Sequence, residues 1–95
     1  MIYKLEFLPS ALKEWHNLDN SIKQQFKKKL EERLSHPEIP SCRLSGWTHH
    51  YKIKLRTAGY RLVYEFIASK KILQVIAIGK REKNLVYLSA RQRSH

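Results

Sequence analysis

The sequence has few of the residues that redox, metal and nucleotide chemistry require. Its 95 residues include one cysteine, Cys42, which excludes an intramolecular disulfide and is compatible with a reducing compartment. His49 and His50 are adjacent without a second spaced pair of ligands, so we expect no metal. The glycine-rich loops GxxxxGK[S/T] and GxGxxG are missing. We therefore expect no cofactor.

Long apolar stretches are also missing. The longest, Ile72–Ile78, is interrupted by Gln74 and is far shorter than the ~20 residues that span a bilayer. The first residues, up to Glu6, contain no apolar segment typical of a signal peptide. We expect a cytoplasmic protein with no membrane partner.

Acidic residues are scarce in the second half of the chain. Residues 51–95 contain eleven Lys or Arg against two acidic residues, Glu65 and Glu82, whereas residues 1–50 contain eight against six. Most of the formal net charge of +11 therefore lies after residue 50. A basic half is typical of nucleic-acid binding, although an acidic protein partner would use the same field. An enzyme with this composition would have to depend on Lys, Arg and Tyr.

The order of apolar patterns predicts an α+β fold, as a single domain over residues 1–95. We expect a mostly antiparallel sheet of about four strands, covered by an N-terminal helix pair and followed by a short C-terminal helix. The expected strands are Ile2–Leu8, Tyr51–Arg56, Tyr60–Ile67 and Ile72–Gly79, the last one central and covered on both faces. The expected helices are Ala11–Leu18, about Ser21–Ser35, and Leu85–Arg93.

Local signals predict how the first two helices begin and which faces they bury. Ser10 is a plausible N-cap, and Ser21 with Gln24 matches a capping box. In the first helix we expect three residues to face the core: Leu12, Trp15 and Leu18. In the second, an apolar stripe contains Ile22, Phe26, Leu30 and Leu34, and the opposite, charged face contains residues 27–29 and 31–33.

The segment YKIKLRTAGYRL, residues 51–62, predicts a cationic sheet face. Alternation places Lys52, Lys54 and Arg56 on one face, and a turn at 57–59, with Gly59 able to take positive φ, brings Arg61 back beside them. Like charges that face one another across a sheet repel. The pattern therefore indicates an anionic ligand, for which a polyphosphate chain is the best fit.

RNA cleavage without a metal needs a base, cations for the pentavalent phosphorane, and an acid. Arginine and lysine suit the phosphate oxygens. We expect the crowding of Lys52 and Lys54 to lower lysine pKa values, which would suit one of these lysines to act as a general acid or base. The surrounding positive charge makes Tyr87 a conceivable base.

Each of these features also has a plainer interpretation. The lysines of residues 51–56 can be the solvated face of an edge strand. Arg61 and Arg81 can pair with carboxylates such as Glu65, and Tyr87 can be a packing residue with a hydrated hydroxyl. The run Lys27–Lys29 can be a solvated helix face that also touches RNA phosphates.

Five segments, with Tyr87 soon after them, resemble the RelE toxins of the RelE/ParE superfamily: ALKEW (11–15), KKKL (27–30), YKIKLR (51–56), GYRLVY (59–64) and GKRE (79–82). The resemblance implies a ribosome-dependent, metal-independent endoribonuclease that cuts mRNA in the A site of the 70S ribosome and leaves a 2′,3′-cyclic phosphate. It also implies a RelB-like antitoxin and co-repression at operator DNA.

The resemblance assigns roles to matching residues. Lys52 and Lys54 would bind phosphate and transfer protons, Arg61 would stabilise the phosphorane, Arg81 would assist the leaving group, and Tyr87 would be the base. The wider RNA or ribosome contacts that we expect are Lys27, Lys28, Arg43, Arg56, Lys80 and Lys83.

Two positions depart from the family pattern. Ser45 stands where relatives often carry a basic residue, and the tail 91–95 is less apolar than theirs. Two rival functions stay open: a ParE-like gyrase inhibitor with the same fold, and a non-catalytic RNA- or ribosome-binding protein.

Overall fold

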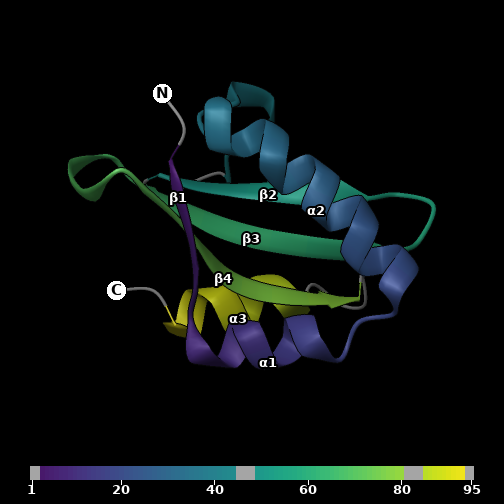
Figure 1. The fold of residues 1–95 in the computed structure, drawn as a ribbon. Coiled ribbons are helices and arrows are strands. Elements are labelled where there is room, and N and C mark those ends of the chain that lie inside the picture. Colours follow the sequence, from purple (N-terminus) through teal and green to yellow (C-terminus); the bar gives the residue numbers. More distant parts are fainter. Residues whose placement is uncertain (1–2, 45–48, 81–84, 94–95) are drawn as a thin grey trace.

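The computed structural model describes residues 3–44, 49–80 and 85–93 (Figure 1). In these ranges it contains a four-stranded sheet, three α-helices and two 3₁₀ turns, which confirms the α+β class. The strands are β1 (Lys4–Phe7), β2 (His50–Leu55), β3 (Tyr60–Ile67) and β4 (Ile72–Lys80). The helices are α1 (Pro9–His16), α2 (Asn20–Ser35) and α3 (Leu85–Arg93), and the 3₁₀ turns are η1 (Pro40–Cys42) and η2 (Ala68–Lys70).

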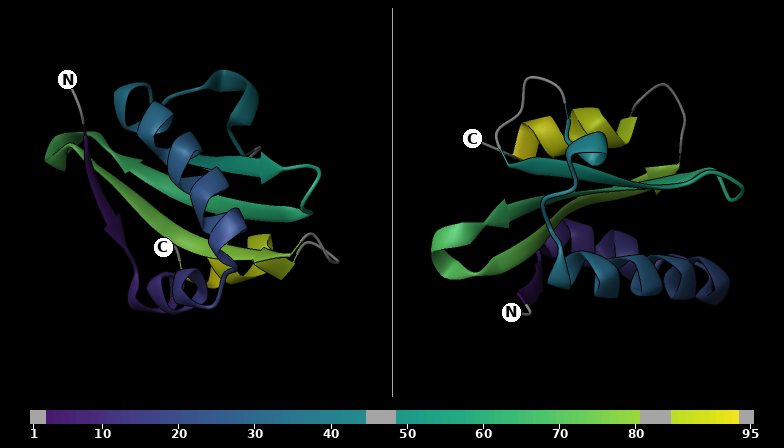
Figure 2. Two further views of the ribbon diagram at one scale, coloured as in Figure 1. Left: turned by 45° about the vertical axis from the view of Figure 1, so that its right-hand side comes forward. Right: turned by 90° about the horizontal axis from the view of Figure 1, so that it is seen from above.

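The sheet separates two clusters of buried apolar residues. α1 and α2 lie on one side of it and α3 on the other (Figure 2). The larger cluster joins the first two helices to the sheet, and its fully buried members include Ala11, Phe26, Leu62, Leu73 and Val75. The smaller cluster lies under α3 and contains Leu44, Val63, Ile76, Ala77, Val86 and Ala90.

β4 is a central strand, as its near-continuous apolar sequence predicts. The strand order is β1-β4-β3-β2, with β1 parallel to β4 and the other pairs antiparallel. The register of β3 against β4 shifts between Val63 and Tyr64. This irregularity is of the kind that re-aims side chains, and both Ile76 and Ala77 pack in the cluster under α3. β2 lies at one edge of the sheet.

The predicted helix caps are wrong. α1 begins at Pro9 with Leu8 as its N-cap, and α2 begins at Asn20 with Asp19 as its N-cap; neither cap makes a side-chain hydrogen bond. The fixed φ of proline suits the first position of a helix, so Pro9 starts α1 and Ser10 lies inside it. Asp19 takes the extended conformation that a cap requires.

Two expectations about helix faces are also wrong. Leu12 is 40% exposed, whereas Trp15 and Leu18 are partly buried against the larger cluster. Ala11 is the buried residue of α1, so the helix packs through a narrow stripe. Arg33, expected on the charged face of α2, is only 7% exposed. It follows Phe26 by seven residues and Leu30 by three, a spacing that keeps it on the buried side.

A pair of charged side chains ties α1 and α3 to the same strand. β1 pairs with β4 only as far as Val75, and beyond that point Glu14 accepts a hydrogen bond from the amide of Ile78 at 3.1 Å. Arg93 donates to the carbonyl of Ile76 at 2.8 Å and to both carboxylate oxygens of Glu14 at 2.9 and 3.2 Å. The polar end of α3 is therefore docked by charge-assisted hydrogen bonds instead of by apolar packing.

The turn between β2 and β3 gives a test of backbone strain. Gly59 has φ +73° with nothing within 4 Å of an added Cβ, so Gly59→Ala is expected to cost about 1–2 kcal/mol through backbone strain alone. Urea unfolding measures the loss. Gly79→Ala is the control, because its Cβ would meet Val86 at an ordinary 3.7 Å, and its effect should stay within about 0.5 kcal/mol. Equal losses in both variants would contradict this account.

Candidate functional site

Three cations from two neighbouring strands share the face of the sheet that α3 partly covers. Lys54 of β2 is directly opposite Arg61 of β3, and Lys52 is opposite Val63, which lies in the cluster under α3. Lys52 and Arg61 are partly buried, and Lys54 is exposed. The alternate residues of β2, Tyr51, Ile53 and Leu55, are buried on the other face.

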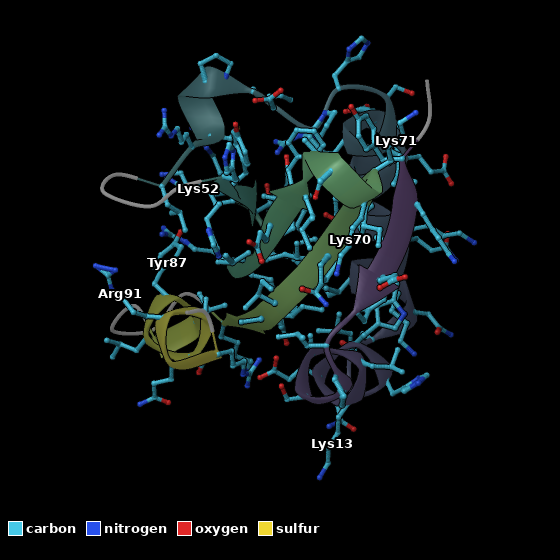
Figure 3. The ribbon with its side chains drawn as sticks, turned by 90° about the vertical axis from the view of Figure 1, so that its left-hand side faces the viewer. Lys13, Lys52, Lys70, Lys71, Tyr87 and Arg91 are labelled. Carbon is cyan, nitrogen blue, oxygen red and sulfur yellow. The ribbon has the colours of Figure 1, made fainter. Side chains whose placement is uncertain are left out.

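Tyr87 joins these cations from α3. Val86 and Ala90 anchor the helix on the sheet, and the partly buried Tyr87 points from the helix toward Lys52 (Figure 3). Nη1 of Arg61 donates a hydrogen bond to the Tyr87 hydroxyl at 2.8 Å, and the guanidinium carbon lies 5.5 Å from the centre of the ring. The phenol oxygen is thus held above the cationic strands.

The neighbouring cations lower the pKa of Lys54. The charge of Lys52 is the largest cause of a lowered pKa at Lys54, followed by the charge of Arg61, and Arg56 adds a smaller effect in the same direction. A lowered pKa makes Lys54 a better proton donor than an ordinary lysine. Lys54 is exposed, so solvent screens this repulsion.

A buried arginine fixes the outer edge of β2. Nη1 of Arg33 donates to the Lys52 carbonyl at 3.3 Å and to the Tyr64 hydroxyl at 3.1 Å. Nη2 donates to Sγ of Cys42 at 3.2 Å, and the Tyr64 hydroxyl donates to the carbonyl of Pro37 at 2.6 Å. Burial raises the pKa of Tyr64 to about 12, so this hydroxyl is neutral at physiological pH.

The other residues predicted to contact RNA or the ribosome do not all lie beside the cationic strands. Arg43 bridges to Tyr51 at the start of β2, Arg56 follows the end of β2, and Lys80 ends β4; all three are exposed. Lys27 and Lys28 are exposed on α2, which packs on the opposite face of the sheet, and they are not brought into the group. Arg81, Lys83 and Ser45 lie outside the described residues.

Sequence reasoning missed two basic residues on this side of the molecule, Arg33 and Arg91, and it gave Lys29 only as part of the run Lys27–Lys29 on a helix face. Lys29 and Arg33 approach β2 from α2, and Arg91 of α3 lies on the same side of the molecule as Lys52 and Tyr87 (Figure 3). The spacing of Arg33 from Phe26 and Leu30 carried a signal for its burial. Nothing in the local sequence indicates that α2 and β2 lie side by side.

The part of the chain that the structure describes contains neither a cluster of metal ligands nor a membrane-spanning helix. Within residues 3–44, 49–80 and 85–93, no three His, Cys, Asp or Glu side chains gather in a way that could hold a metal ion. No described helix has the length and apolar character needed to cross a membrane.

The crowding at Lys54 can be tested by titration. Lys52→Met removes the largest cause of the lowered Lys54 pKa, so the Lys54 pKa should rise. NMR titration of labelled lysine side chains measures it. Lys70→Met removes the same charge from the exposed turn η2 and should leave Lys54 unchanged. A Lys54 pKa that stays constant or falls in Lys52→Met would refute this electrostatic explanation.

Comparison with known proteins places the chain in a family. Residues 5–85 match the model of the family described as ParE toxin of type II toxin–antitoxin system, parDE. The mRNA interferase toxin RelE of Escherichia coli K12 is 48% identical over 93 residues, which make up 98% of each chain. A mutant of E. coli RelE solved in the free state matches with a TM-score of 0.93 and 46% identity over 100% of both chains.

A complex has also been solved for this relative. The intact E. coli RelBE toxin–antitoxin complex contains a chain that matches with a TM-score of 0.82 and 48% identity, over 85% of this chain and 99% of that one. Near-complete coverage at this identity goes well beyond a shared fold. The chain therefore belongs to the RelE/ParE family of type II toxin–antitoxin toxins and is a RelE-type member of it.

Proposed function

We propose that this protein is a ribosome-dependent endoribonuclease that cleaves mRNA in the ribosomal A site without a metal. The observation that carries the proposal is the convergence of Lys52, Lys54, Arg61 and Tyr87 on one face, with Arg61 hydrogen-bonded to Tyr87. A 48% identical relative that is named as an mRNA interferase supports it.

In the proposed reaction the 2′-oxygen of one nucleotide attacks its own 3′-phosphorus. The new P–O2′ bond forms as the P–O5′ bond breaks, which leaves a 2′,3′-cyclic phosphate and a 5′-hydroxyl. The phenolate form of Tyr87 takes the proton of the 2′-hydroxyl, and Arg61 and Lys52 stabilise the charge on the phosphorane. The Arg61–Tyr87 hydrogen bond supports this division, because it holds the base beside the phosphate-binding cations.

Lys54 is the proposed proton donor to the leaving 5′-oxygen. Its lowered pKa supports that role, since a proton donor works best when its pKa approaches the working pH. Arg81, which the family resemblance also connects with the leaving group, stays a second candidate.

Dependence on the ribosome follows from the weakness of this acid–base set. The described site has no carboxylate–histidine pair, so little of the barrier is removed on a flexible free RNA. A ribosome that holds the codon with the 2′-oxygen in line would supply orientation, which is worth up to ~7–11 kcal/mol in well-aligned systems.

The partners follow from the same family. We propose that a RelB-like antitoxin binds this toxin, as RelB binds RelE in the E. coli complex, and that the pair represses its own operon through operator DNA. We also propose that residues 1–95 act as one cytoplasmic toxin domain, with Arg43, Arg56 and Lys80 as further RNA or ribosome contacts and with Lys27 and Lys28 more distant from the cut.

Primer extension on a defined message tests the function. Purified ribosomes would hold a known codon in the A site, with one reaction lacking ribosomes and one using toxin pre-treated with chelator. Cleavage within that codon, only on ribosomes and unaffected by chelation, is expected. Ribosome binding without cleavage would favour the non-catalytic alternative, and neither binding nor cleavage would favour a gyrase inhibitor.

Replacement of one hydroxyl tests the proposed base. Tyr87→Phe should bind ribosomes normally and lose ~10²–10⁴-fold in the single-turnover cleavage rate, the range for general acid–base catalysis. Tyr3→Phe removes the same atom from a ring that packs on Phe66 of the larger cluster, and it should cleave normally. Normal cleavage by Tyr87→Phe would show that Tyr87 is not the base.

The charge of the toxin predicts how it meets its antitoxin. An acidic or amphipathic partner attracted by the basic half should associate more slowly as salt rises, because screening removes long-range steering. Stopped-flow mixing of the two proteins between 50 and 500 mM salt measures the association rate. A rate independent of ionic strength would contradict steering by charge.

A further inference from the structure

An open pocket of about 280 Å³ lies where α2 meets the outer edge of β2. Five cations line it: Lys29 and Arg33 from α2, and Lys52, Lys54 and Arg56 from the β2 segment. Cys42 of η1 also lines the pocket, and its lining residues include no carboxylate. It is slightly smaller than typical pockets for drug-sized ligands, which suits a group such as a phosphate with its sugar.

Arg33 gives this pocket a buried positive charge. Its charge is buried to 93%, yet among the residues that the structure describes it pairs with no carboxylate. Its hydrogen bonds go instead to two oxygens and a sulfur, those of Lys52, Tyr64 and Cys42. A buried charge without a counter-ion is costly unless an anion completes its surroundings.

The backbone of β2 also offers one hydrogen-bond donor at this edge. The carbonyls of His50 and Lys52 point outward, to the amide of Leu44 and to Arg33 respectively. In an antiparallel strand every second residue directs both its N–H and its C=O to the same side. The amide of Lys54 is therefore directed to this edge, where it can add a neutral donor to the charged ones.

We propose that this pocket is a second phosphate subsite, which holds a backbone phosphate of the RNA next to the one that is cleaved. The inference rests on the proposed function. Lys52 and Lys54 lie between the two places, lining the pocket and sharing a face with Arg61. A strand that presents one phosphate to Arg61 and Tyr87 passes this edge with the next, where Lys29 and Arg33 bind it.

Lys29 provides the test, because it is exposed on α2 and its replacement should not disturb folding. Lys29→Ala should weaken binding of a short single-stranded RNA, 2′-O-methylated to prevent cleavage, by about tenfold, the loss expected for one charge-assisted contact. The slope of log affinity against log salt should fall by ~0.7, the value for one phosphate of a single strand. Fluorescence anisotropy at several salt concentrations measures both.

Lys70→Ala is the matched control. It removes the same charge from η2, and Lys70 lies well away from Lys52 (Figure 3). Both quantities should stay as in the unmodified protein. If Lys29→Ala and Lys70→Ala change the RNA affinity and the salt slope equally, or if neither changes them, then Lys29 contributes no more than any surface charge and the subsite is refuted.

RNAs with one uncharged methylphosphonate linkage locate the contact. When the uncharged linkage replaces the phosphate next to the cleaved one, it should weaken binding by the unmodified protein. Lys29→Ala should lose less affinity than the unmodified protein at that position only. Equal sensitivity of Lys29→Ala and the unmodified protein at every position would overturn the proposal. An effect of Lys29→Ala on antitoxin affinity but not on RNA affinity would also overturn it, in favour of an acidic peptide in the pocket.

Free phosphate is the other source of the same chemistry. NMR titrations distinguish the two sources. If the amide signals of Cys42 and Lys52 shift saturably with inorganic phosphate but do not shift with RNA, the pocket binds a small anion and the RNA subsite is contradicted. These binding experiments require no cleavage. If the unmodified protein cleaves and the Lys29→Ala substitution has no effect on RNA binding, the proposed function stands and the subsite alone is rejected. If the protein binds RNA through the pocket but does not cleave it, the nuclease function is rejected.

Discussion

The placement of Lys52, Lys54 and Arg61 on one face of two paired strands is the constraint on which the rest of the site depends. These cations share one face of two paired strands, and the lowered pKa of Lys54 records their mutual repulsion. The fold opposes it with buried contacts on the other face, where Ile53, Leu55 and Leu62 pack in the larger cluster. The protein thus keeps a cationic surface in place before an anion arrives, a preorganisation that phosphoryl chemistry needs.

The terminal helix completes this surface, and its docking depends on residues far from the cations. Arg93 and Glu14 fasten the end of α3 to β4, while Val86 and Ala90 bury its apolar side. Tyr87 is therefore positioned by its own hydrogen bond from Arg61, by the bonds of Arg93 to Glu14 and to the carbonyl of Ile76, and by the apolar packing of α3.

Much of the fold could be predicted from the sequence, because its signals are local. Alternation in residues 51–56 predicted that Lys52 and Lys54 share one face and that Ile53 lies on the other, and the apolar run of β4 predicted a central strand. Helix starts failed where two neighbouring signals competed, since Pro9 outweighed Ser10 and Asp19 outweighed Ser21. The lesson is that cap residues indicate the region of a helix start more reliably than the residue itself.

The site could be predicted only in part, for a physical reason. Arg61 returns beside Lys54 through a short hairpin, which is a local event, whereas Arg33 reaches Lys52 across 19 residues of chain. That contact depends on how α2 lies against the edge strand, which no local pattern determines. The charge of Arg33 favoured an exposed position, although its spacing from the apolar stripe of α2 favoured a buried one. Its hydrogen bonds to Tyr64, Cys42 and the Lys52 carbonyl offset the cost of burying that charge.

The central claim is that lysine, arginine and tyrosine side chains cut RNA by activating its own 2′-hydroxyl. End-group analysis of message cleaved on ribosomes by chelator-treated toxin tests it most directly. The account predicts a 2′,3′-cyclic phosphate on the upstream fragment and a 5′-hydroxyl on the downstream one. A 3′-hydroxyl with a 5′-phosphate would show that water or a metal-bound hydroxide attacks instead, and would contradict the account.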